Sequence, residues 1–195
     1  KGIIFLHNGL GDVVMALPVL QAIEEHAMKA PGQWVVYVGN SAAYNLLQSL
    51  GYEKHFKLKQ WHGHLINYLE VIGALPEYFL APHSSGDWRM SSLSLLSGAK
   101  KRSGTVVGCV SRIGFNMGIP SYFTLRMHKV LHYLKVVSAV GLKVPSEPEI
   151  KIDVQEAWVN SAAARFPELK QQKRWLLCAP GSSESERHKR WRLDG

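Results

Sequence analysis

Residues 2–25 read GIIFLHNGLGDVVMALPVLQAIEE, and this stretch decides the fold class. Residues 2–6 are apolar and typical of a buried strand, and they lead into a turn with two glycines at residues 8–12. The apolar residues that follow recur at helical spacing, at Val13, Val14, Leu17, Leu20 and Ile23. Strand, glycine turn and helix is how an open α/β sheet begins, and ligands bind beyond the carboxyl ends of such strands.

The same alternation of strands and helices continues along the chain. Strands are predicted at residues 33–38, 53–59, 78–81, 105–110, 150–154 and 175–179. Helices are predicted at residues 41–50 (with Ser41 as N-cap), 64–75, 90–97, 125–140 and 155–169. Residues 100–102 are expected to form a basic turn, and residues 112–124 a glycine-rich, irregular and mobile loop. This order predicts a Rossmann-like α/β fold, a mostly parallel sheet with helices on both faces.

The end of the sequence predicts the start of a second α/β unit. A buried strand and a Pro-Gly-Ser-Ser turn at residues 175–185 call for a following helix, which the remaining residues do not complete. We therefore expect a Rossmann-like domain at residues 1–154, a helix and connector at 155–174, and the first strand and loop of a second domain at 175–195.

The composition is that of a folded, basic protein. The chain has 195 residues, 46% of them hydrophobic and 19% charged, with a net charge of +8. This charge favours an anionic partner, such as a phosphorylated substrate, an anionic membrane face or nucleic acid. The basic residues are scattered and form no known nucleic-acid-binding signature, which argues against nucleic acid. No apolar run reaches the roughly 18–20 residues of a membrane span, so we expect a cytoplasmic protein.

Cysteine and histidine spacing gives no metal site. Cys109 and Cys178 each lie in an apolar run and are expected to pack as small hydrophobic residues in a reducing compartment. His128 and His132 have the i, i+4 spacing of metal ligands, but no glutamate or third ligand accompanies them. A basic helix face is the better interpretation of these two histidines.

Asp12, in the glycine turn, has two interpretations that the residues alone support equally. It can cap the helix that follows, or it can serve as a catalytic base that points into the crevice. The loop from His83 to Arg89 has a similar pair of interpretations, as a site for an anionic sugar or as a plain surface loop.

Residues 179–191, APGSSESERHKRW, form the clearest candidate for phosphate binding. The backbone and hydroxyls of Ser182 and Ser183 could bind a phosphate, and Lys189 and Arg190 could neutralise a diphosphate. The alternative is a solvated basic loop.

Several short motifs, in order along the chain, resemble those of the bacterial heptosyltransferases, glycosyltransferase family 9. They are Gly9-Leu10-Gly11-Asp12 with Leu17-Pro18 and Leu20, His83–Leu96 followed by Ser97-Gly98-Ala99 and Arg102-Ser103-Gly104, His128-Lys129-Val130 with Tyr133-Leu134, and Pro180-Gly181-Ser182 with Lys189-Arg190-Trp191. The resemblance covers almost the whole chain.

The resemblance implies a GT-B enzyme, with two Rossmann-like domains and the active site between them. The first domain would bind an anionic glycolipid acceptor of the lipopolysaccharide-core type. The second would bind a nucleotide sugar, typically ADP-heptose, and no further cofactor is implied. Transfer would proceed with inversion of the anomeric carbon. Because the acceptor would be a membrane lipid, the enzyme would contact the cytoplasmic face of the membrane.

The resemblance also implies roles for individual residues. Asp12 would be the catalytic base. Lys189, with Ser182 and Ser183, would stabilise the departing diphosphate without a metal ion. The acceptor would contact Gly11, His83, Arg89 and His128.

Two departures from the family pattern affect these expectations. Gly9 stands where the family usually has an arginine, so the acceptor contacts near Asp12 are expected to differ. Most of the donor domain would follow Gly195, so these 195 residues are expected to be inactive alone. Two alternatives stay open at this point. One is a related glycosyltransferase of another surface glycan with a different nucleotide sugar, and the other is a non-catalytic Rossmann-like binding module with Asp12 as a helix cap.

Overall fold

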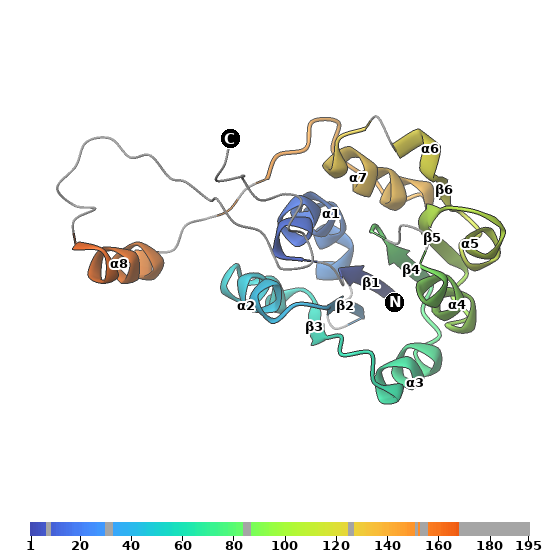
Figure 1. Ribbon diagram of the computed structural model, residues 1–195, viewed down its shortest axis with the longest axis horizontal. Helices are drawn as coiled ribbons and strands as arrows, with labels where there is room; N and C mark the ends of the chain where they lie inside the picture. Colours follow the sequence, from blue (N-terminus) through green and yellow to red (C-terminus); the bar gives the residue numbers. More distant parts are fainter. Residues whose placement is uncertain are drawn as a thin grey trace, which may run out of the picture. The chain divides into compact units, whose positions relative to one another are not determined.

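Parallel strands in the order β3-β2-β1-β4-β5-β6 form one sheet in the computed structural model, which describes residues 1–6, 9–29, 33–83, 87–124, 127–150, 152 and 156–167 (Figure 1). The strands are β1 (Gly2–Leu6), β2 (Trp34–Val38), β3 (Lys57–Gln60), β4 (Tyr78–Ala81), β5 (Lys101–Val106) and β6 (Ile119–Pro120). Every pair of neighbouring strands is parallel. The α/β, Rossmann-like prediction is therefore confirmed.

Helices cover both faces of this sheet. One face carries α1 (Leu10–Lys29), α2 (Ser41–Ser49) and α7 (Lys129–Ala139), and the other carries α3 (Leu65–Gly73), α4 (Trp88–Leu96) and α5 (Cys109–Gly114). In Figure 1, α1 and α7 lie above the strands and α3 and α4 below them. Short helices η1 (Tyr52–Lys54) and α6 (Ser121–Thr124) lie between these elements.

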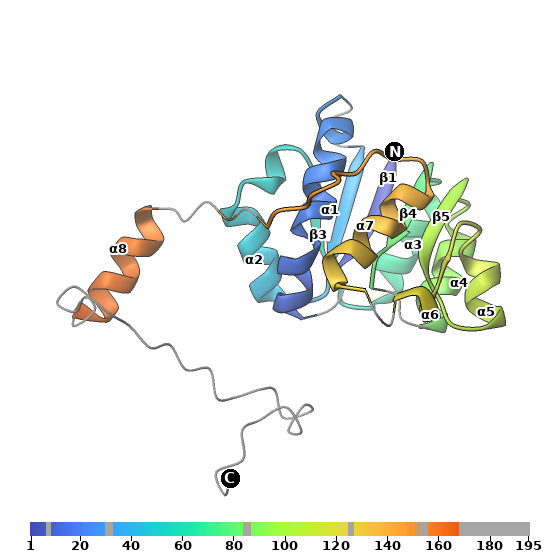
Figure 2. The same ribbon diagram turned by 90° about the horizontal axis from the view of Figure 1, so that it is seen from above.

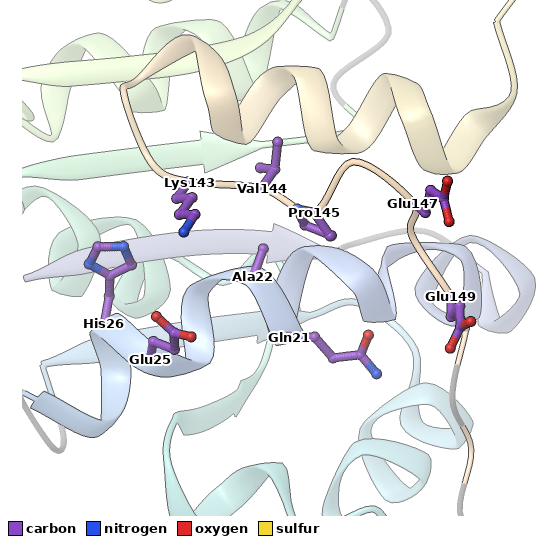
Figure 3. Close-up of a pocket in the computed structure, with 9 residues that line it drawn as sticks. All are labelled: Gln21, Ala22, Glu25, His26, Lys143, Val144, Pro145, Glu147 and Glu149. Atoms are coloured by element: carbon purple, nitrogen blue, oxygen red, sulfur yellow. The ribbon is translucent and has the colours of Figure 1, made fainter.

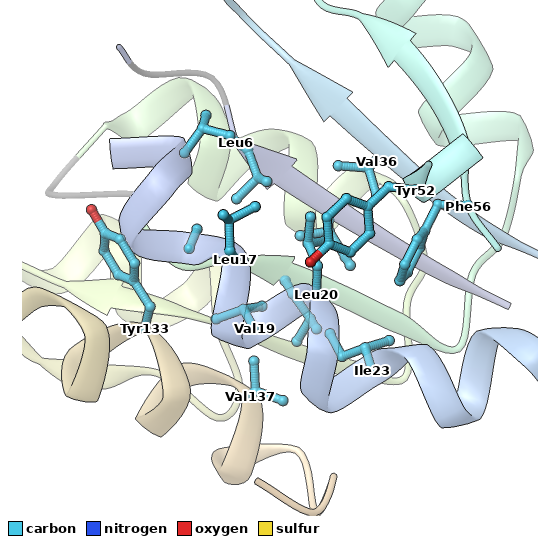
Figure 4. Close-up of a cluster of buried hydrophobic side chains, with 14 of the residues drawn as sticks. Leu6, Leu17, Val19, Leu20, Ile23, Val36, Tyr52, Phe56, Tyr133 and Val137 are labelled. Carbon is cyan, nitrogen blue, oxygen red and sulfur yellow. The ribbon is translucent and has the colours of Figure 1, made fainter. Parts of the chain in front are cut away.

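The alternation of side chains along β1 divides the core into two layers. Ile4 and Leu6 pack with α1, α2 and α7, whereas Ile3 and Phe5 pack with α3 and α4. All four side chains are buried, which explains why the strand sequence is apolar throughout instead of alternating. Figure 4 shows the first layer, in which Leu17, Leu20 and Ile23 of α1 face the sheet.

The order of the strands creates a switch point between β1 and β4. The chain moves outward from β1 to β2 and β3 and then returns to place β4 on the other side of β1. In open α/β sheets ligands bind beyond the carboxyl ends of the strands at such a point, which here means beyond Leu6 and Ala81, where β1 and β4 end. The fold therefore specifies where a ligand site is expected.

The predicted boundaries of β5 and of the following segment are wrong. Lys101 and Arg102 begin the strand instead of forming a turn, and the strand ends at Val106 instead of Val110. The basic side chains are held at the strand: Lys101 Nζ lies 5.0 Å from the ring centroid of Tyr78, and Arg102 donates to the carbonyls of Ala99 and Gly114.

Residues 112–124 are not an irregular loop, because α5, β6 and α6 together cover most of residues 109–124. Gly114 explains the error. Its α-carbon lies so close to the backbone of Ser91 that a side chain would overlap it. The Ser94 hydroxyl donates to the Gly114 carbonyl at 2.9 Å. The glycine permits close packing of α5 on α4 and does not indicate a loose segment.

Smaller corrections concern caps and a cysteine. Asn40, not Ser41, caps α2, since its side chain accepts from the N–H groups of Ala42 (2.9 Å) and Ala43 (3.2 Å). The strand predicted at residues 53–59 begins only at Lys57, after η1. Cys109 is an exposed free thiol at the start of α5 and not a buried residue.

The C-terminal part of the chain is a separate unit, residues 153–195, after the unit of residues 1–152. It contains α8 (Glu156–Arg165), so a helix is confirmed within the predicted range of residues 155–169, but it ends earlier than predicted, at Arg165. Ile150 and Ile152 are outside any strand, and the rest of the predicted strand at 150–154 lies outside the described residues. None of the helices in the described ranges combines the length and apolar character needed to cross a bilayer.

Candidate functional site

The switch point brings three side chains together from distant parts of the sequence. The Tyr133 hydroxyl lies 3.1 Å from Oδ1 of Asp12 and 2.8 Å from Nδ1 of His83. The Asp12 Oδ1 and His83 Nδ1 atoms are 3.9 Å apart. We define Asp12, His83 and Tyr133 as the switch-point cluster.

Each member of the switch-point cluster is positioned by a different element. Asp12 is the third residue of α1, directly beyond the carboxyl end of β1, and His83 follows β4 by two residues. Tyr133 lies on α7, which packs against α1; Figure 2 shows these helices side by side. Tyr133 is 1% exposed and belongs to the hydrophobic core, while its hydroxyl points away from that core toward the start of α1 (Figure 4).

The hydrogen bonds give the cluster a defined direction. Tyr133 donates its single hydroxyl proton to the Asp12 carboxylate. The Tyr133 oxygen can then only accept from His83, so Nδ1 of His83 carries a proton in this arrangement. Burial, and then the charge of Asp12 and its hydrogen bond, raise the pKa of Tyr133 well above 10. The tyrosine therefore stays a donor to Asp12 at neutral pH.

The Asp12 carboxylate remains accessible. Its side chain is 29% exposed, and that of His83 is 18% exposed. Within the described residues, its hydrogen bond comes from Tyr133 and not from the backbone N–H groups of α1. This geometry differs from that of a helix cap, in which the side chain accepts from its own helix. An accessible carboxylate that is held by a tyrosine can bind and deprotonate a hydroxyl group.

A second hydrogen bond lies beneath the switch-point cluster and fixes α7 to the sheet. Nε2 of His132 lies 2.8 Å from the Thr105 hydroxyl on β5, and both side chains are buried. Burial, followed by the charges of Lys129 and His83, lowers the pKa of His132 to about 4. His132 is thus neutral at pH 7 and acts as an anchor. The expected basic helix face is wrong for this residue.

His128 is the N-cap residue of α7, the helix that carries Tyr133. It is exposed and precedes α7, and its Nδ1 accepts from the N–H of Val130 at 3.4 Å. This long cap holds His128 at the start of α7, whereas Tyr133 lies near the middle of that helix. An acceptor contact by His128 stays a prediction.

Gly11 lies on the open side of α1, one residue before Asp12. It is exposed, and a Cβ built on it meets no atom within 4 Å, as is also true of Gly9. The approach to Asp12 is therefore free of side chains at both positions. A larger group, such as the arginine that the resembling family has at the place of Gly9, would extend into this space.

Arg89 is not part of the switch-point cluster. It lies in the first turn of α4, where Asp87 accepts from its backbone N–H at 2.9 Å, and its guanidinium is 6.0 Å from the ring centroid of Trp88. It lines a pocket of about 410 Å³ together with Gly39, Trp61, His62, Gly63, Tyr68, Asp87 and Met90.

This Arg89 pocket shares the carboxyl edge of the sheet with the cluster but lies on the α3 and α4 side. The N–H of Gly39, which follows β2, donates to the carbonyl of Leu6 at the end of β1. The end of β1 therefore separates Asp12, on one side, from the pocket on the other. Trp61 and Tyr68 form aromatic walls, as in many sugar sites, and Arg89 adds a cation.

Another pocket, of about 550 Å³, lies over the second half of α1 (Figure 3). Gln21, Ala22, Glu25 and His26 line it, together with Lys143, Val144, Pro145, Glu147 and Glu149. At 1.5 Å per helical residue, Gln21 lies roughly 14 Å along the helix from Asp12. This pocket is separate from the switch-point cluster.

The remaining predicted residues, Ser182, Ser183 and Lys189, lie outside the described residues. Among the residues that are described, no group of three His, Cys, Asp or Glu side chains is placed to hold a metal ion. Tyr133 was missed as a site residue. It was quoted only as part of the motif on residues 128–134 and was given no role.

Neither a protein-family model, nor a curated protein, nor a solved structure matches this chain.

Proposed function

We propose that the chain supplies the acceptor side of an inverting glycosyltransferase, with Asp12 as the catalytic base. The observation that supports this most directly is the accessible Asp12 carboxylate, held by Tyr133 at the switch point of a Rossmann-like sheet. Ligands of such sheets bind at this edge. The proposed substrates follow from the resemblance to the heptosyltransferases. They are a nucleotide-linked heptose as donor and an anionic glycolipid of the lipopolysaccharide-core type as acceptor.

The proposed reaction needs one proton transfer and one displacement. Asp12 takes the proton of an acceptor hydroxyl while that oxygen forms a bond to the anomeric carbon of the donor. The bond between this carbon and the diphosphate oxygen breaks, and its electron pair leaves with the diphosphate. In this proposal Lys189, Ser182 and Ser183, on a second domain, stabilise that charge. Gly11, His83, Arg89 and His128 bind the acceptor.

Cytoplasmic location and contact with the inner face of a membrane belong to the same proposal. An acceptor that is a membrane lipid requires the enzyme to work at the bilayer surface. The net charge of +8 supports an anionic substrate or surface. Gly9, which lacks the arginine of the resembling family, supports the alternative of a related transferase with another surface glycan as acceptor.

The test is Asp12→Asn in the enzyme that contains both proposed domains, assayed for transfer from ADP-heptose to a lipopolysaccharide-core acceptor. Loss of a general base lowers the rate by about 10²–10⁴. Glu24→Gln is a matched control, because Glu24 lies on the same helix and pairs with His55 at the surface (3.3 Å). Circular dichroism verifies that both variants fold. Normal transfer by Asp12→Asn would show that the assignment of the base is wrong.

The alternative substrates need a separate measurement. Binding of a panel of nucleotide sugars and of anionic glycans, by calorimetry, distinguishes a heptosyltransferase from a relative with another donor. A binding module without catalysis would bind a ligand yet give no product with any donor, and its affinity would not depend on Asp12.

A further inference from the structure

Helix α3 presents three large apolar side chains to solvent. Leu65, Ile66 and Leu69 are 74%, 66% and 58% exposed. They fall within about 100° of the helix circumference, since successive residues are 100° apart. The helix is fixed to the protein by its other side, where Val71 is buried and Tyr68 and Ile72 are partly buried. The exposed stripe is therefore not needed for the core.

Trp88 adds an aromatic side chain to the same region. It is the first residue of α4, is 63% exposed, and belongs to a helix that contacts α3 (Figure 1). Both helices follow parallel strands, so both begin at the carboxyl edge of the sheet. We call Leu65, Ile66, Leu69 and Trp88 the α3 surface.

Two exposed cations flank the α3 surface. Arg89 lies beside Trp88, and Lys57 on the edge strand β3 acts electrostatically on Glu70 of α3. Two acidic side chains nearby have partners. Glu70 forms an ion pair with Lys59 at 2.6 Å, which lowers the pKa of Glu70, and Asp87 caps α4.

This combination is characteristic of a surface that binds anionic lipid. Leucine, isoleucine and tryptophan side chains enter the boundary between headgroups and acyl chains, while arginine and lysine meet the headgroup phosphates. A protein partner would bury the apolar stripe equally well, but it would not by itself account for the exposed cations Arg89 and Lys57 beside that stripe. These two cations favour the bilayer.

We infer that the α3 surface docks the protein on an anionic bilayer, with the Arg89 pocket directed to the lipid headgroups. Tyr68 of α3 and Arg89, the neighbour of Trp88 on α4, line the pocket, so a docked bilayer would lie beside the pocket. This inference specifies the membrane contact of the proposed function and rests on it to that extent. Vesicle binding is measured without sugar transfer, so the two proposals can fail separately.

The experiment measures co-sedimentation of the 195-residue chain with vesicles of phosphatidylcholine and phosphatidylglycerol in a two-to-one mixture. We expect binding that weakens with salt and with pure phosphatidylcholine. The combined variant Leu65→Gln, Ile66→Gln, Leu69→Gln should bind at least about tenfold more weakly, because each substitution removes apolar groups that would be buried in the bilayer. Ile113→Gln with Leu131→Gln is the matched control, because these residues are 64% and 44% exposed on α5 and α7.

Three outcomes decide the inference. Loss of binding in the α3 variant alone, with unchanged circular dichroism, supports it. Equal binding by the α3 variant and the control overturns it. A third result would also overturn it: the chain does not bind vesicles but forms a dimer in ultracentrifugation, and the α3 variant abolishes this dimer. A second copy of the chain would then cover the α3 surface.

Discussion

The Tyr133 hydroxyl donates a 3.1 Å hydrogen bond to Oδ1 of Asp12, across 121 positions of the sequence. The bond exists because α1 and α7 lie side by side on one face of the sheet and both begin at its carboxyl edge. It connects the first and last helices of the described Rossmann-like unit at the point where the strand order reverses. A substitution of one of these two residues should therefore alter the position of the other side chain.

Removing the Tyr133 hydroxyl tests this connection. Tyr133→Phe keeps the buried ring and should cost about 1 kcal/mol in the free energy of unfolding, the typical value for one hydrogen bond. If the proposed two-domain transferase is correct, we expect its kcat to fall about tenfold or more with little change in KM, because Asp12 loses its orientation toward the proposed acceptor. Tyr52→Phe, which removes another hydroxyl from the same core layer, should leave kcat unchanged. Wild-type kcat in Tyr133→Phe would show that the bond is dispensable.

Substitution at Gly11 separates a role in folding from a role in binding. A Cβ at this position meets nothing within 4 Å, so Gly11→Ala should fold normally and gain up to about 1 kcal/mol, as alanine favours a helix over glycine. If the acceptor contacts Gly11, the affinity of the variant for the acceptor should nevertheless fall. Denaturation and calorimetry on the same variant measure the two effects.

Gly114→Ala provides the contrast for this experiment. Its Cβ would overlap the backbone of Ser91, so the variant should lose stability. Unchanged acceptor affinity in Gly11→Ala would remove Gly11 from the proposed acceptor site.

The sequence predicted those parts of the fold that local patterns control. The apolar run at residues 2–6, the glycine turn and the helical spacing after it identified β1 and α1, and the repeated alternation identified the sheet. The end of β5 was missed because the apolar sequence continues through Val107 and Val110. The strand nevertheless stops, since Val107 is 53% exposed and Gly108 turns the chain at φ 118°.

The candidate site was predictable only in part. Asp12 and His83 were identified because each follows a predicted strand, and strand ends meet at one edge. Tyr133 was quoted only within a motif, and it is a buried core residue whose hydroxyl reaches the cluster. Which polar atom that hydroxyl reaches depends on how α7 packs on α1, which no local pattern encodes.

The buried His132 should make stability depend on pH below neutrality. Its folded pKa of about 4 lies below the ordinary value of 6.5, so between these values the unfolded chain binds a proton that the folded chain does not. Stability from this group is complete above pH 6.5 and is lost as the pH falls toward 4, by at most about 3 kcal/mol.

Urea denaturation across this range measures the loss. His132→Gln can keep a hydrogen bond to Thr105 but cannot titrate, so the stability of this variant should fall less steeply with pH than that of the wild type. The same slope in both proteins would mean that His132 is protonated in the folded state without cost.

Leu75 offers a stabilising substitution. It follows the C-cap of α3, Ala74, and has φ 42°, in the left-handed region that glycine adopts more easily than leucine. Its side chain is 71% exposed, so little packing is lost on truncation. Leu75→Gly should therefore raise the free energy of unfolding by about 0.5–1 kcal/mol. Leu69→Gly, inside the same helix, should lower it by about 1 kcal/mol. Chemical denaturation of both variants tests this difference in sign, and destabilisation by Leu75→Gly would show that the leucine side chain contributes more than its backbone strain costs.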